Sequence, residues 1–574
     1  MAVPVSNREV AAILYEVADL LEMKDVKFKP AAYRRAAHTI ETVAEDIGRV
    51  AERGELEDLP GVGTHIAGKL KEILESGKLG YLERLKAEVG PGVRELAEIG
   101  GIGPKKAMLL HQKLGIGNAD QLEAAARAGK IRALPGFKEK SEANILASIA
   151  THRQRAGRSL LGRMLPVAEA IRARLAAHPA VRQVSLAGSL RRMKETIGDI
   201  DILASSAEPD AVMAAFTALP EVTRILGRGT TKSSVVIDPG VQVDLRVVEE
   251  GQYATALQYF TGSKDHNIAL RRRALERGWS LSEYGLKDEK SKKNLAVSTE
   301  EELYRILGLP FIEPELRENR GEIEAAESGT LPALVPYNAP AGDLHVHSDW
   351  SDGRDSIRTL ALAAKERGYR YLAICDHARG PGIEKGLDAG KIGEQRAVIE
   401  QLNRELGGIV LLQGIECNIG PDGNPDLPPD VLKDLDIVIA SVHDSLRMKG
   451  EEMTQRVLAA IHHEHVDILG HPTGRLLLRR EPSDLDLPAI FRAAADQHVA
   501  LEINSSPSRL DLSDTNCRKA RDAGAVFAIN SDAHAADELG EIRLGIATAR
   551  RGWLTAEDIV NTRPAGDLRG WFRR

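Results

Sequence analysis

The chain has 574 residues and a formal net charge of −7 at pH 7. A chain of this length exceeds what one hydrophobic core supports, so three or four domains are expected. Hydrophobic residues make up 43% and charged residues 28%, which is ordinary for a globular protein. Because the net charge is negative, any binding of nucleic acid has to come from local basic faces.

The sequence predicts neither a membrane partner nor an export signal. No uninterrupted apolar run approaches the length needed to span a membrane, and the region after Met1 lacks a basic stretch followed by an apolar one. The three cysteines, Cys375, Cys417 and Cys517, are far apart and form no CxxC pair, which predicts reduced thiols. We expect a cytoplasmic enzyme, and a monomer by default.

The N-terminal part shows helical periodicity, interrupted by glycine-bearing turns. The turns are LPGVGT at 59–64, IGGIGP at 99–104 and, more weakly, LPGF at 134–137. Each resembles a helix-hairpin-helix turn, in which glycines let the backbone approach a DNA phosphate beside the free N–H groups of the next helix. A plain link between two helices is the alternative, and the repetition disfavours it. The candidate DNA contacts are Gly61, Gly63, Gly101 and Gly103.

An Asp-x-Asp pair, Asp199 and Asp201, lies inside an apolar run that predicts a strand. Side chains alternate along a strand, so both carboxylates point to the same face. Such a pair favours Mg²⁺, a hard cation that shares its oxygen ligands with substrate phosphates. Asp244, in a second apolar run, can supply a third carboxylate from a neighbouring strand; an isolated pair would instead indicate a solvated strand edge. Just before Asp199 in the sequence lie the candidate phosphate-binding residues, Gly188, Ser189 and Arg192.

Four ordered segments carry a family resemblance. They are GSLRR at 188–192, GDIDIL at 198–203, VDLR at 243–246 and YFTGS at 259–263. In this order they resemble the family X DNA polymerases. The resemblance implies a nucleotidyltransferase palm and thumb that act on gapped or primed DNA with deoxynucleoside triphosphates.

The resemblance also implies roles for individual residues. The three aspartates would hold Mg²⁺ or Mn²⁺, and the turn that begins with Tyr259 would lie against the incoming sugar. Asn267 would contact the minor-groove edge of the nucleotide, and Arg271 the template. Gln242 and Lys264 depart from the family pattern, so rate and fidelity do not transfer. The implied nucleotide-binding residues are Gly188, Ser189, Arg192, Gly198, Tyr259, Phe260, Thr261, Gly262 and Asn267.

The first hairpin, with AAYRRAA upstream, resembles the lyase domain of the same family. Lys69 falls at the position of that family's Schiff-base lysine. An amine nucleophile has to be partly deprotonated, which depends on its surroundings. His65 stands where the family often has another lysine, so a phosphate contact is an equal alternative for Lys69.

A second constellation begins at Asp343, where histidines and acids end successive strand-like apolar runs. Strands alternating with helical stretches predict a βα barrel, and residues at the carboxyl ends of its strands meet at one mouth. Nitrogen and oxygen ligands without a thiolate favour a cluster of Zn²⁺ or Mn²⁺, which suits attack of water on phosphate. The candidate ligands are His345, His347, Asp352, His377, Glu416, His443, His471, Asp532 and His534.

The pattern HxHxxxxD at 345–352, followed by HPTGR at 471–475 and SDAH at 531–534, resembles the PHP (polymerase and histidinol phosphatase) domain. All nine ligand positions of that family are filled here, which implies up to three ions. By contrast, the histidine cluster 462–465 resembles a metal site in composition only and is interpreted as a helix end. Arg475 could hold a phosphate or form a salt bridge at the start of a helix.

The predicted fold is therefore multidomain. All-α helix-hairpin-helix domains precede an α+β nucleotidyltransferase palm with a thumb, and a distorted (β/α) barrel of PHP type follows. The predicted ranges are a lyase-like domain at 1–85, fingers at 86–152, palm at 153–250, thumb at 251–318, a linker at 319–340 and the barrel at 341–574.

The predicted function is short-gap filling in base excision repair by two-metal nucleotidyl transfer. The barrel would process 3′ ends as a 3′–5′ exonuclease, a 3′-phosphatase or an abasic-site endonuclease. Three alternatives stay open: a phosphoesterase with a weak polymerase, a DNA-end-binding scaffold, and a small-molecule phosphatase.

Overall fold

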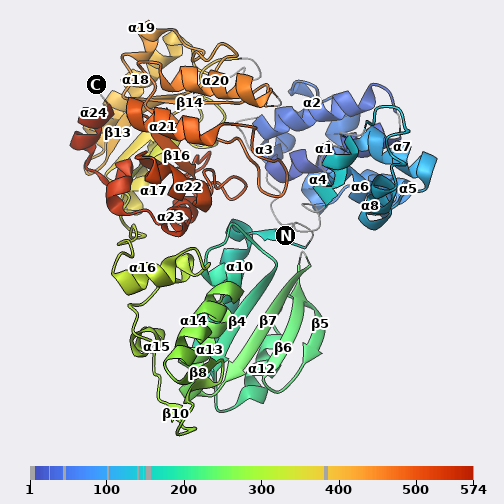
Figure 1. Cartoon of the computed structure of the whole chain (residues 1–574). Coiled ribbons are helices and arrows are strands. Elements are labelled where there is room, and N and C mark those ends of the chain that lie inside the picture. The colour runs from blue at the N-terminus through green and yellow to red at the C-terminus, as the bar shows by residue number, and fades with distance from the viewer. Residues whose placement is uncertain are drawn as a thin grey trace. The chain divides into compact units, whose positions relative to one another are not determined.

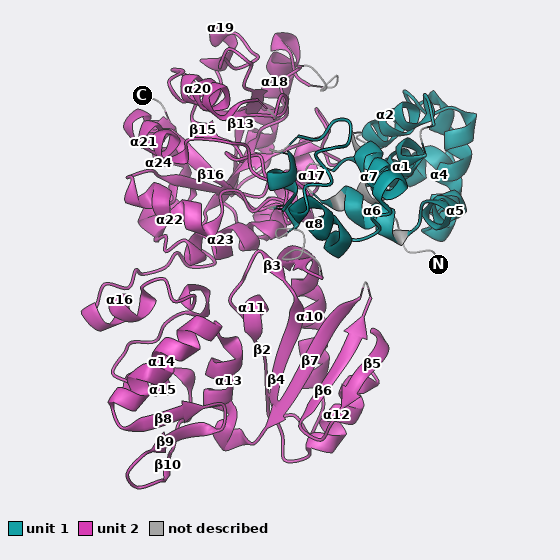
Figure 2. Ribbon diagram, turned by 45° about the vertical axis from the view of Figure 1, so that its right-hand side comes forward, with its two compact units in different colours: residues 1–156 teal, residues 157–574 magenta. Residues whose placement is uncertain are grey.

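The computed structural model describes residues 7–24, 26–42, 47–99, 102–138, 141–146, 148–149, 157–238, 240–380, 386–446 and 448–572. The chain divides into two compact units, Met1–Ala156 and Gly157–Arg574 (Figure 2). The division lies close to the predicted start of the palm. None of the helices in these described ranges is long and apolar enough to cross a membrane.

The first unit is helical, as predicted. Its helices share one core, in which Leu14, Ile40, Leu70 and Leu110 are fully buried. Two of the predicted hairpin turns each precede a helix, α4 or α7, and the turn glycine is the cap of that helix. The elements are α1 (Asn7–Met23), α2 (Lys29–Thr42), α3 (Ile47–Glu52), η1 (Leu56–Asp58), α4 (Thr64–Ser76), α5 (Gly80–Val89), α6 (Pro91–Glu98), α7 (Pro104–Leu114) and α8 (Ala119–Arg127).

The second unit opens with a mixed five-stranded sheet of order β2-β4-β7-β6-β5 (Figure 1). Alternation along β4 buries Ile202 with helices α10 and α12 on one face, and Leu203 with α13 on the other. This is the predicted palm. Its elements are β1 (Ser159–Leu160), α10 (Leu161–Ala176), β2 (Gln183–Leu186), α11 (Gly188–Arg191), β3 (Thr196–Ile197), β4 (Asp199–Ser205), α12 (Pro209–Thr217), β5 (Val222–Arg228), β6 (Lys232–Ile237), β7 (Val241–Val248) and η2 (Glu250–Gln252).

The thumb follows, with a small antiparallel sheet beside its helices. The stretch 319–340, expected as a linker, contains helix α16, and buried Ile323 and Ala326 pack in the same cluster as the thumb residues. The elements are α13 (Tyr253–Thr261), α14 (Lys264–Glu276), β8 (Trp279–Ser282), β9 (Gly285–Asp288), β10 (Asn294–Leu295), α15 (Glu300–Ile306), η3 (Pro314–Leu316) and α16 (Glu322–Ser328).

The C-terminal part is a seven-stranded, all-parallel sheet in sequence order from β11 to β17. A parallel bridge between Val346 and Ala533 brings the first and last strands together, so the sheet is nearly closed, as the predicted barrel requires. The strands are β11 (Gly342–Val346), β12 (Tyr371–Ile374), β13 (Val410–Asn418), β14 (Ile437–Ser441), β15 (Ile468–Leu469), β16 (Ala500–Asn504) and β17 (Phe527–Asn530).

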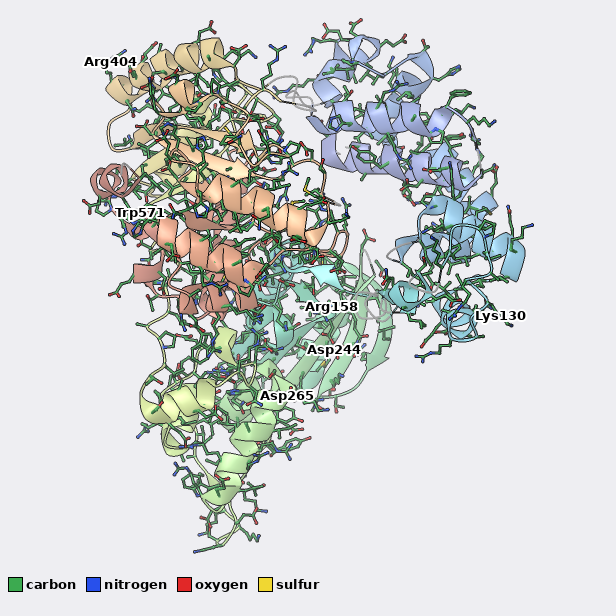
Figure 3. The ribbon with its side chains drawn as sticks, turned by 45° about the horizontal axis from the view of Figure 1, so that its top comes forward. Lys130, Arg158, Asp244, Asp265, Arg404 and Trp571 are labelled. Carbon is green, nitrogen blue, oxygen red and sulfur yellow. The ribbon has the colours of Figure 1, made fainter. Side chains whose placement is uncertain are left out.

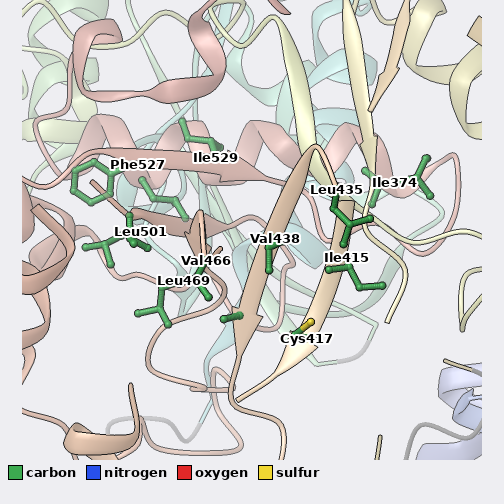
Figure 4. Packing of buried hydrophobic residues seen from close by; sticks show 14 of the residues in the cluster. Ile374, Ile415, Cys417, Leu435, Val438, Val466, Leu469, Leu501, Phe527 and Ile529 are labelled. Atoms are coloured by element: carbon green, nitrogen blue, oxygen red, sulfur yellow. The ribbon is translucent and has the colours of Figure 1, made fainter. Parts of the chain in front are cut away.

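Strand alternation also builds the barrel's two hydrophobic clusters. Leu372 and Ile374 face the cluster shared with the surrounding helices (Figure 4), whereas Tyr371 and Ala373 face a second cluster that Phe572 joins. The three cysteines are buried and free, as expected of reduced thiols. The helices are α17 (Ile357–Glu366), α18 (Ala389–Glu405), α19 (Pro429–Leu432), α20 (Gly450–Ile461), α21 (Leu487–Gln497), α22 (Asp514–Asp522), α23 (Ile542–Arg551) and α24 (Ala565–Phe572), with the short turns η4 (Glu538–Glu541), η5 (Ala556–Asp558) and η6 (Val560–Thr562).

Candidate active sites

The palm sheet brings the three predicted aspartates together. Strands β4 and β7 run parallel, with Asp201 directly opposite Asp244 and Asp199 opposite Gln242 (Figure 3 labels Asp244). Ile200, between the two β4 aspartates, is fully buried. The carboxylates therefore share one face of adjacent strands, which is the arrangement that the Asp-x-Asp spacing predicted.

Gly188 allows the phosphate-binding loop to approach this cluster. Its φ is +61°, and a Cβ there would lie 2.1 Å from Oδ2 of Asp201. Any side chain at this position would displace the Asp201 carboxylate. The loop backbone and one aspartate are thus packed against each other only because the residue is glycine.

The environments of Asp201 and Asp244 separate their pKa values. Burial, with the nearby charges of Asp199 and Asp244, raises the pKa of Asp201 to about 7. The pKa of Asp244 is lowered despite its burial, because Lys232 and Gln242 hold the carboxylate. Lys232 Nζ lies 2.9 Å from Asp244 Oδ2, and Gln242 Nε2 donates to Oδ1 at 2.8 Å. Sequence reasoning missed Lys232, which meets Asp244 only through the pairing of β6 with β7.

Arg192, the predicted triphosphate ligand, lies against the YFTG turn. Its Nη1 donates to the Thr261 carbonyl, and its Nε donates to Glu318 Oε1 at 3.0 Å. A Cβ on Gly262 would lie 3.0 Å from Nη1. Ser189 lies in the same short helix, α11, as Gly188, and Gly198 immediately precedes β4.

The remaining predicted nucleotide residues lie on α13 and α14. Asn267 is held by α13, since its Nδ2 donates to the Tyr259 carbonyl at 2.7 Å and its Oδ1 accepts from Gln258. Phe260 lies beside the palm, with the Arg246 guanidinium 4.8 Å from its ring centre. The Arg271 side chain on α14 is exposed.

The barrel collects all nine predicted ligands. His345 and Glu416 lie near the carboxyl ends of β11 and β13, and the others lie in the segments that follow strands, so the parallel sheet carries them to one mouth. Three groups of side chains have ligand atoms within 4.8 Å of one another: His347, Asp352, His377 and His534; His345, His347 and Asp532; and His377, Glu416 and His443. The three palm carboxylates do not form such a group among the described residues.

Glu416 is the common neighbour of several imidazoles. Its Oε1 lies 3.1 Å from Nε2 of both His443 and His471, and its Oε2 lies 3.0 Å from Nδ1 of His377. Glu416 is 1% exposed, and the nearby imidazoles hold its pKa well below the usual value even though burial alone would raise it. Asp352 belongs to the same cluster, and its Oδ2 lies 3.3 Å from His534 Nε2.

Several buried atoms of the barrel site lack a hydrogen-bond partner among the described residues. They are the Nδ1 atoms of His347, His443 and His471. Buried polar nitrogens without partners are costly unless they bind a ligand. Two residues, Asp532 at φ +57° and His471 at φ +24°, also hold conformations that side chains rarely adopt. The donor set therefore fits metal ions, and the barrel is a metal-binding domain.

Glu502 is the residue of this site that sequence reasoning missed. It is fully buried on β16, and its Oε1 lies 2.7 Å from Nδ1 of His345. Its Oε2 accepts from the backbone N–H of His471 at 2.6 Å. A carboxylate on the far nitrogen of a ligating histidine fixes the ring and its tautomer. The signal was a single acid within the apolar run VALEIN.

The structure shows the surroundings of Arg475 and of the histidine cluster at 462–465. Arg475 Nη2 donates to Glu195 Oε2 at 2.7 Å and to the Leu510 carbonyl, so it forms a salt bridge, although it does not lie at the start of a helix as that alternative assumed. His462 follows the last residue of α20 and its Nδ1 lies 2.7 Å from the Leu458 carbonyl oxygen. The histidine cluster is therefore at a helix end, as interpreted.

The first unit presents two uncapped helix starts. Gly63 is the cap residue of α4 and Gly103 that of α7, and glycine has no side chain that could cap the helix. A Cβ on Gly63 or Gly103 would meet open space, whereas one on Gly61, at φ +80°, would lie 3.3 Å from Arg35 Cβ. Gly101 lies outside the described residues. The Nζ atom of Lys69 lies 3.3 Å from the His65 carbonyl oxygen and 4.9 Å from the Tyr81 ring centre.

Taken together, the fold and the two sites define a class: a nucleotidyltransferase core joined to a metal-binding barrel. Family models agree with this division. They match a helix-hairpin-helix domain at 5–79, a SAM-like helix-hairpin-helix tandem at 93–151, a DNA polymerase beta thumb at 256–318 and a PHP domain at 343–506.

Relatives extend the match to the whole chain. The DNA polymerase/3′-5′ exonuclease PolX of Bacillus subtilis (strain 168) is 36% identical over 571 residues, which is 99% of each chain. The chain therefore belongs to the family X DNA polymerases that carry a PHP domain. A probable phosphatase of Thermoanaerobacter sp. (strain X514) is 29% identical, and the probable phosphatase YcdX of Escherichia coli (strain K12 / DH10B) is 32% identical. These two alignments cover 38% and 39% of this chain, and 89% and 90% of the two phosphatases.

Proposed function

We propose that the chain is a DNA-directed DNA polymerase that fills short gaps during base excision repair, with a 3′–5′ exonuclease in its barrel. The observation that carries the proposal is that one chain holds two sets of candidate ligands. They are the aspartates on two paired palm strands, and the eight grouped side chains of the barrel together with His471, which contacts Glu416. The Bacillus subtilis relative, similar over its whole length, bears both activities in its name.

In the palm, the chain's own groups provide position and charge. Asp244 is held anionic by Lys232 and faces Asp201, so it is placed to assist removal of the proton from a primer 3′-hydroxyl. Ser189, Arg192 and Gly198 would steady the triphosphate, and the turn from Tyr259 to Gly262 would lie against the sugar. Bound Mg²⁺ or Mn²⁺ would neutralise charge on the phosphates and activate the attacking oxygen.

In the barrel, the imidazoles and carboxylates would hold two or three Zn²⁺ or Mn²⁺ ions, which suit activation of water for attack on a phosphodiester. Glu502 would orient His345, and Glu416 would lie at the centre of the cluster. Related 3′-end reactions, removal of a 3′-phosphate and incision at an abasic site, need the same attack on phosphorus. We propose that the enzyme works as a monomer in the cytoplasm, on gapped or primed DNA.

One observation favours a second candidate for the barrel. The two probable phosphatases match this region over most of their own length. A barrel that acts on small phosphate esters would hydrolyse them faster than a DNA 3′ end, and this is directly measurable.

The test uses a 5′-labelled primer on a one-nucleotide gap, incubated with Mn²⁺ with and without deoxynucleotides. The proposal predicts that wild type shortens the primer without nucleotides and extends it with them. His345→Ala should abolish only shortening. If wild type never shortens the primer but hydrolyses p-nitrophenyl phosphate, the barrel is a small-molecule phosphatase; if gap binding alone remains and neither reaction occurs, the chain is a DNA-end scaffold.

The hairpin contacts and Lys69 are a separate proposal. The uncapped starts of α4 and α7 support backbone contacts with DNA phosphates at Gly61, Gly63 and Gly103, and Gly101 belongs to the same predicted turn as Gly103. Arg271 would contact the template. We retain 5′-deoxyribose-phosphate lyase activity for Lys69 as a prediction, which borohydride trapping on nicked abasic DNA tests against Lys69→Ala.

A further inference from the structure

Helix α23 of the barrel packs directly against the polymerase part of the second unit. Leu544 and Ala547 belong to the same buried cluster as residues of α10 and the palm strands. The helix follows Asp532 and His534 through the short turn η4, so it leads from the metal site towards the palm. Its last residue, Arg551, is 3% exposed at the side chain.

Arg551 reaches the loop that carries the predicted triphosphate ligand. Its Nη1 donates to the backbone carbonyl of Arg192 at 2.7 Å and to Glu318 Oε1 at 3.0 Å. Its Nη2 donates to Asp514 Oδ2 at 2.7 Å, within the barrel. One buried guanidinium thus joins barrel, thumb end and nucleotide loop.

Glu318 is shared between the two arginines. The same oxygen, Oε1, accepts from Arg192 Nε at 3.0 Å and from Arg551 Nη1 at 3.0 Å. Lys194 Nζ lies 4.0 Å from it. Removing Arg551 would leave the Glu318 charge to attract Arg192 more strongly, away from any phosphate bound beside Gly188 and Asp201.

We propose that Arg551, a residue of the barrel, is a positioning residue for nucleotidyl transfer. It fixes the Arg192 backbone and partly neutralises Glu318, so that the Arg192 guanidinium meets the triphosphate of the incoming nucleotide. This inference rests on the proposed polymerase function. It assigns to the barrel a part in nucleotide binding in addition to its own chemistry.

The neighbouring Arg550 provides a matched control. It is buried on the same helix and also binds the segment before Glu318: its Nε donates to Glu315 Oε1 at 2.7 Å, and its guanidinium lies 5.0 Å from the Tyr337 ring centre. None of the hydrogen bonds described for Arg550 goes to Arg192 or Glu318. A substitution there loosens the same interface without touching the nucleotide loop.

The experiment measures single-nucleotide gap filling by the full chain for wild type, Arg551→Met, Arg551→Lys and Arg550→Met. We expect Arg551→Met to raise KM for the deoxynucleotide about ten- to hundred-fold, with a smaller change in kcat. The reason is that displacing a substrate-positioning group by about 1 Å can lower enzyme efficiency about 100-fold. Arg551→Lys should give an intermediate KM, because one ammonium group cannot reach both the Arg192 carbonyl and the Asp514 carboxylate. Arg550→Met should change KM less than about threefold. Exonuclease activity, unchanged in all variants, reports an intact barrel.

A double-mutant cycle tests whether Arg551 acts through Arg192. In an Arg192→Ala background, Arg551→Met should raise KM no further, because the residue it positions is gone. Equal effects of Arg551→Met and Arg550→Met, or full additivity with Arg192→Ala, would overturn the inference while leaving the polymerase intact. No incorporation by wild type would instead overturn the proposed function and the inference together.

Discussion

The palm and the barrel each present candidate cation ligands for a phosphate-containing substrate, but the two ligand sets differ in burial and in their partners. The candidate barrel ligands lie close together and are mostly buried, and some of their imidazole nitrogens lack a hydrogen-bond partner among the described residues. The palm carboxylates are half-buried, and one of them is paired with Lys232. We therefore expect ions that stay bound in the barrel, whose buried nitrogens need a ligand, and ions that arrive with the nucleotide in the palm.

The strongest effect expected is on polymerization. Asp199→Asn keeps the shape of the β4 strand but removes one charge from the palm cluster. Loss of several kcal/mol of transition-state stabilisation predicts about a 1,000-fold or greater fall in the rate of incorporation. Exonuclease activity should remain near wild type. A variant that still incorporates nucleotides at more than about a tenth of the wild-type rate would break the palm assignment.

The next effect concerns the centre of the barrel. Glu416→Gln preserves volume and removes the carboxylate that neighbours His377, His443 and His471. We expect primer shortening to fall at least about 100-fold, while gap filling persists. His463→Ala, at the half-buried position after the end of α20, is the control and should change neither reaction. Equal loss in both variants would mean that the barrel assay reports folding.

Stability should respond to chelation through the barrel. Ions that bind only the folded state add about 2.7 kcal/mol at a concentration 100 times their Kd. Scanning calorimetry of wild type should therefore show a transition that moves down by several degrees in EDTA. His347→Ala should start lower and respond less, and Asp199→Asn should respond as wild type does. An EDTA response that survives in His347→Ala would contradict the assignment of resident ions to the barrel.

The smallest effect is the pH dependence of the palm. Burial beside Asp199 and Asp244 raises the pKa of Asp201 to about 7, above its ordinary value of about 3.9. The folded chain keeps a proton that the unfolded chain releases, so metal-free wild type loses stability as the pH rises from about 4 to about 7. Asp201→Asn lacks this loss. Urea unfolding in EDTA should show the variant gaining about 1–2 kcal/mol relative to wild type between pH 5 and pH 8, after allowance for solvent. A constant difference would show that Asp201 titrates normally.

Much of the fold and of the two candidate sites could be predicted from the sequence, because strand alternation and strand ends are local properties. The Asp-x-Asp spacing predicted a shared face, and ligand residues after apolar runs predicted one barrel mouth. The roles of Lys232, Glu502 and Arg551 could not be predicted, since each depends on which strands pair or which helix packs on the palm. Proline and glutamate in 319–340 indicated a linker, but burial of Ile323 against the thumb is a tertiary contact that composition does not record.

The most direct test of resident against recruited ions is the metal content of purified chain after gel filtration in metal-free buffer. Mass spectrometry of wild type, Asp199→Asn and His347→Ala measures it. The account predicts two or three ions per wild-type chain, the same number in Asp199→Asn and a loss of at least one in His347→Ala. A wild-type chain that retains no ions, or a loss confined to Asp199→Asn, would contradict it.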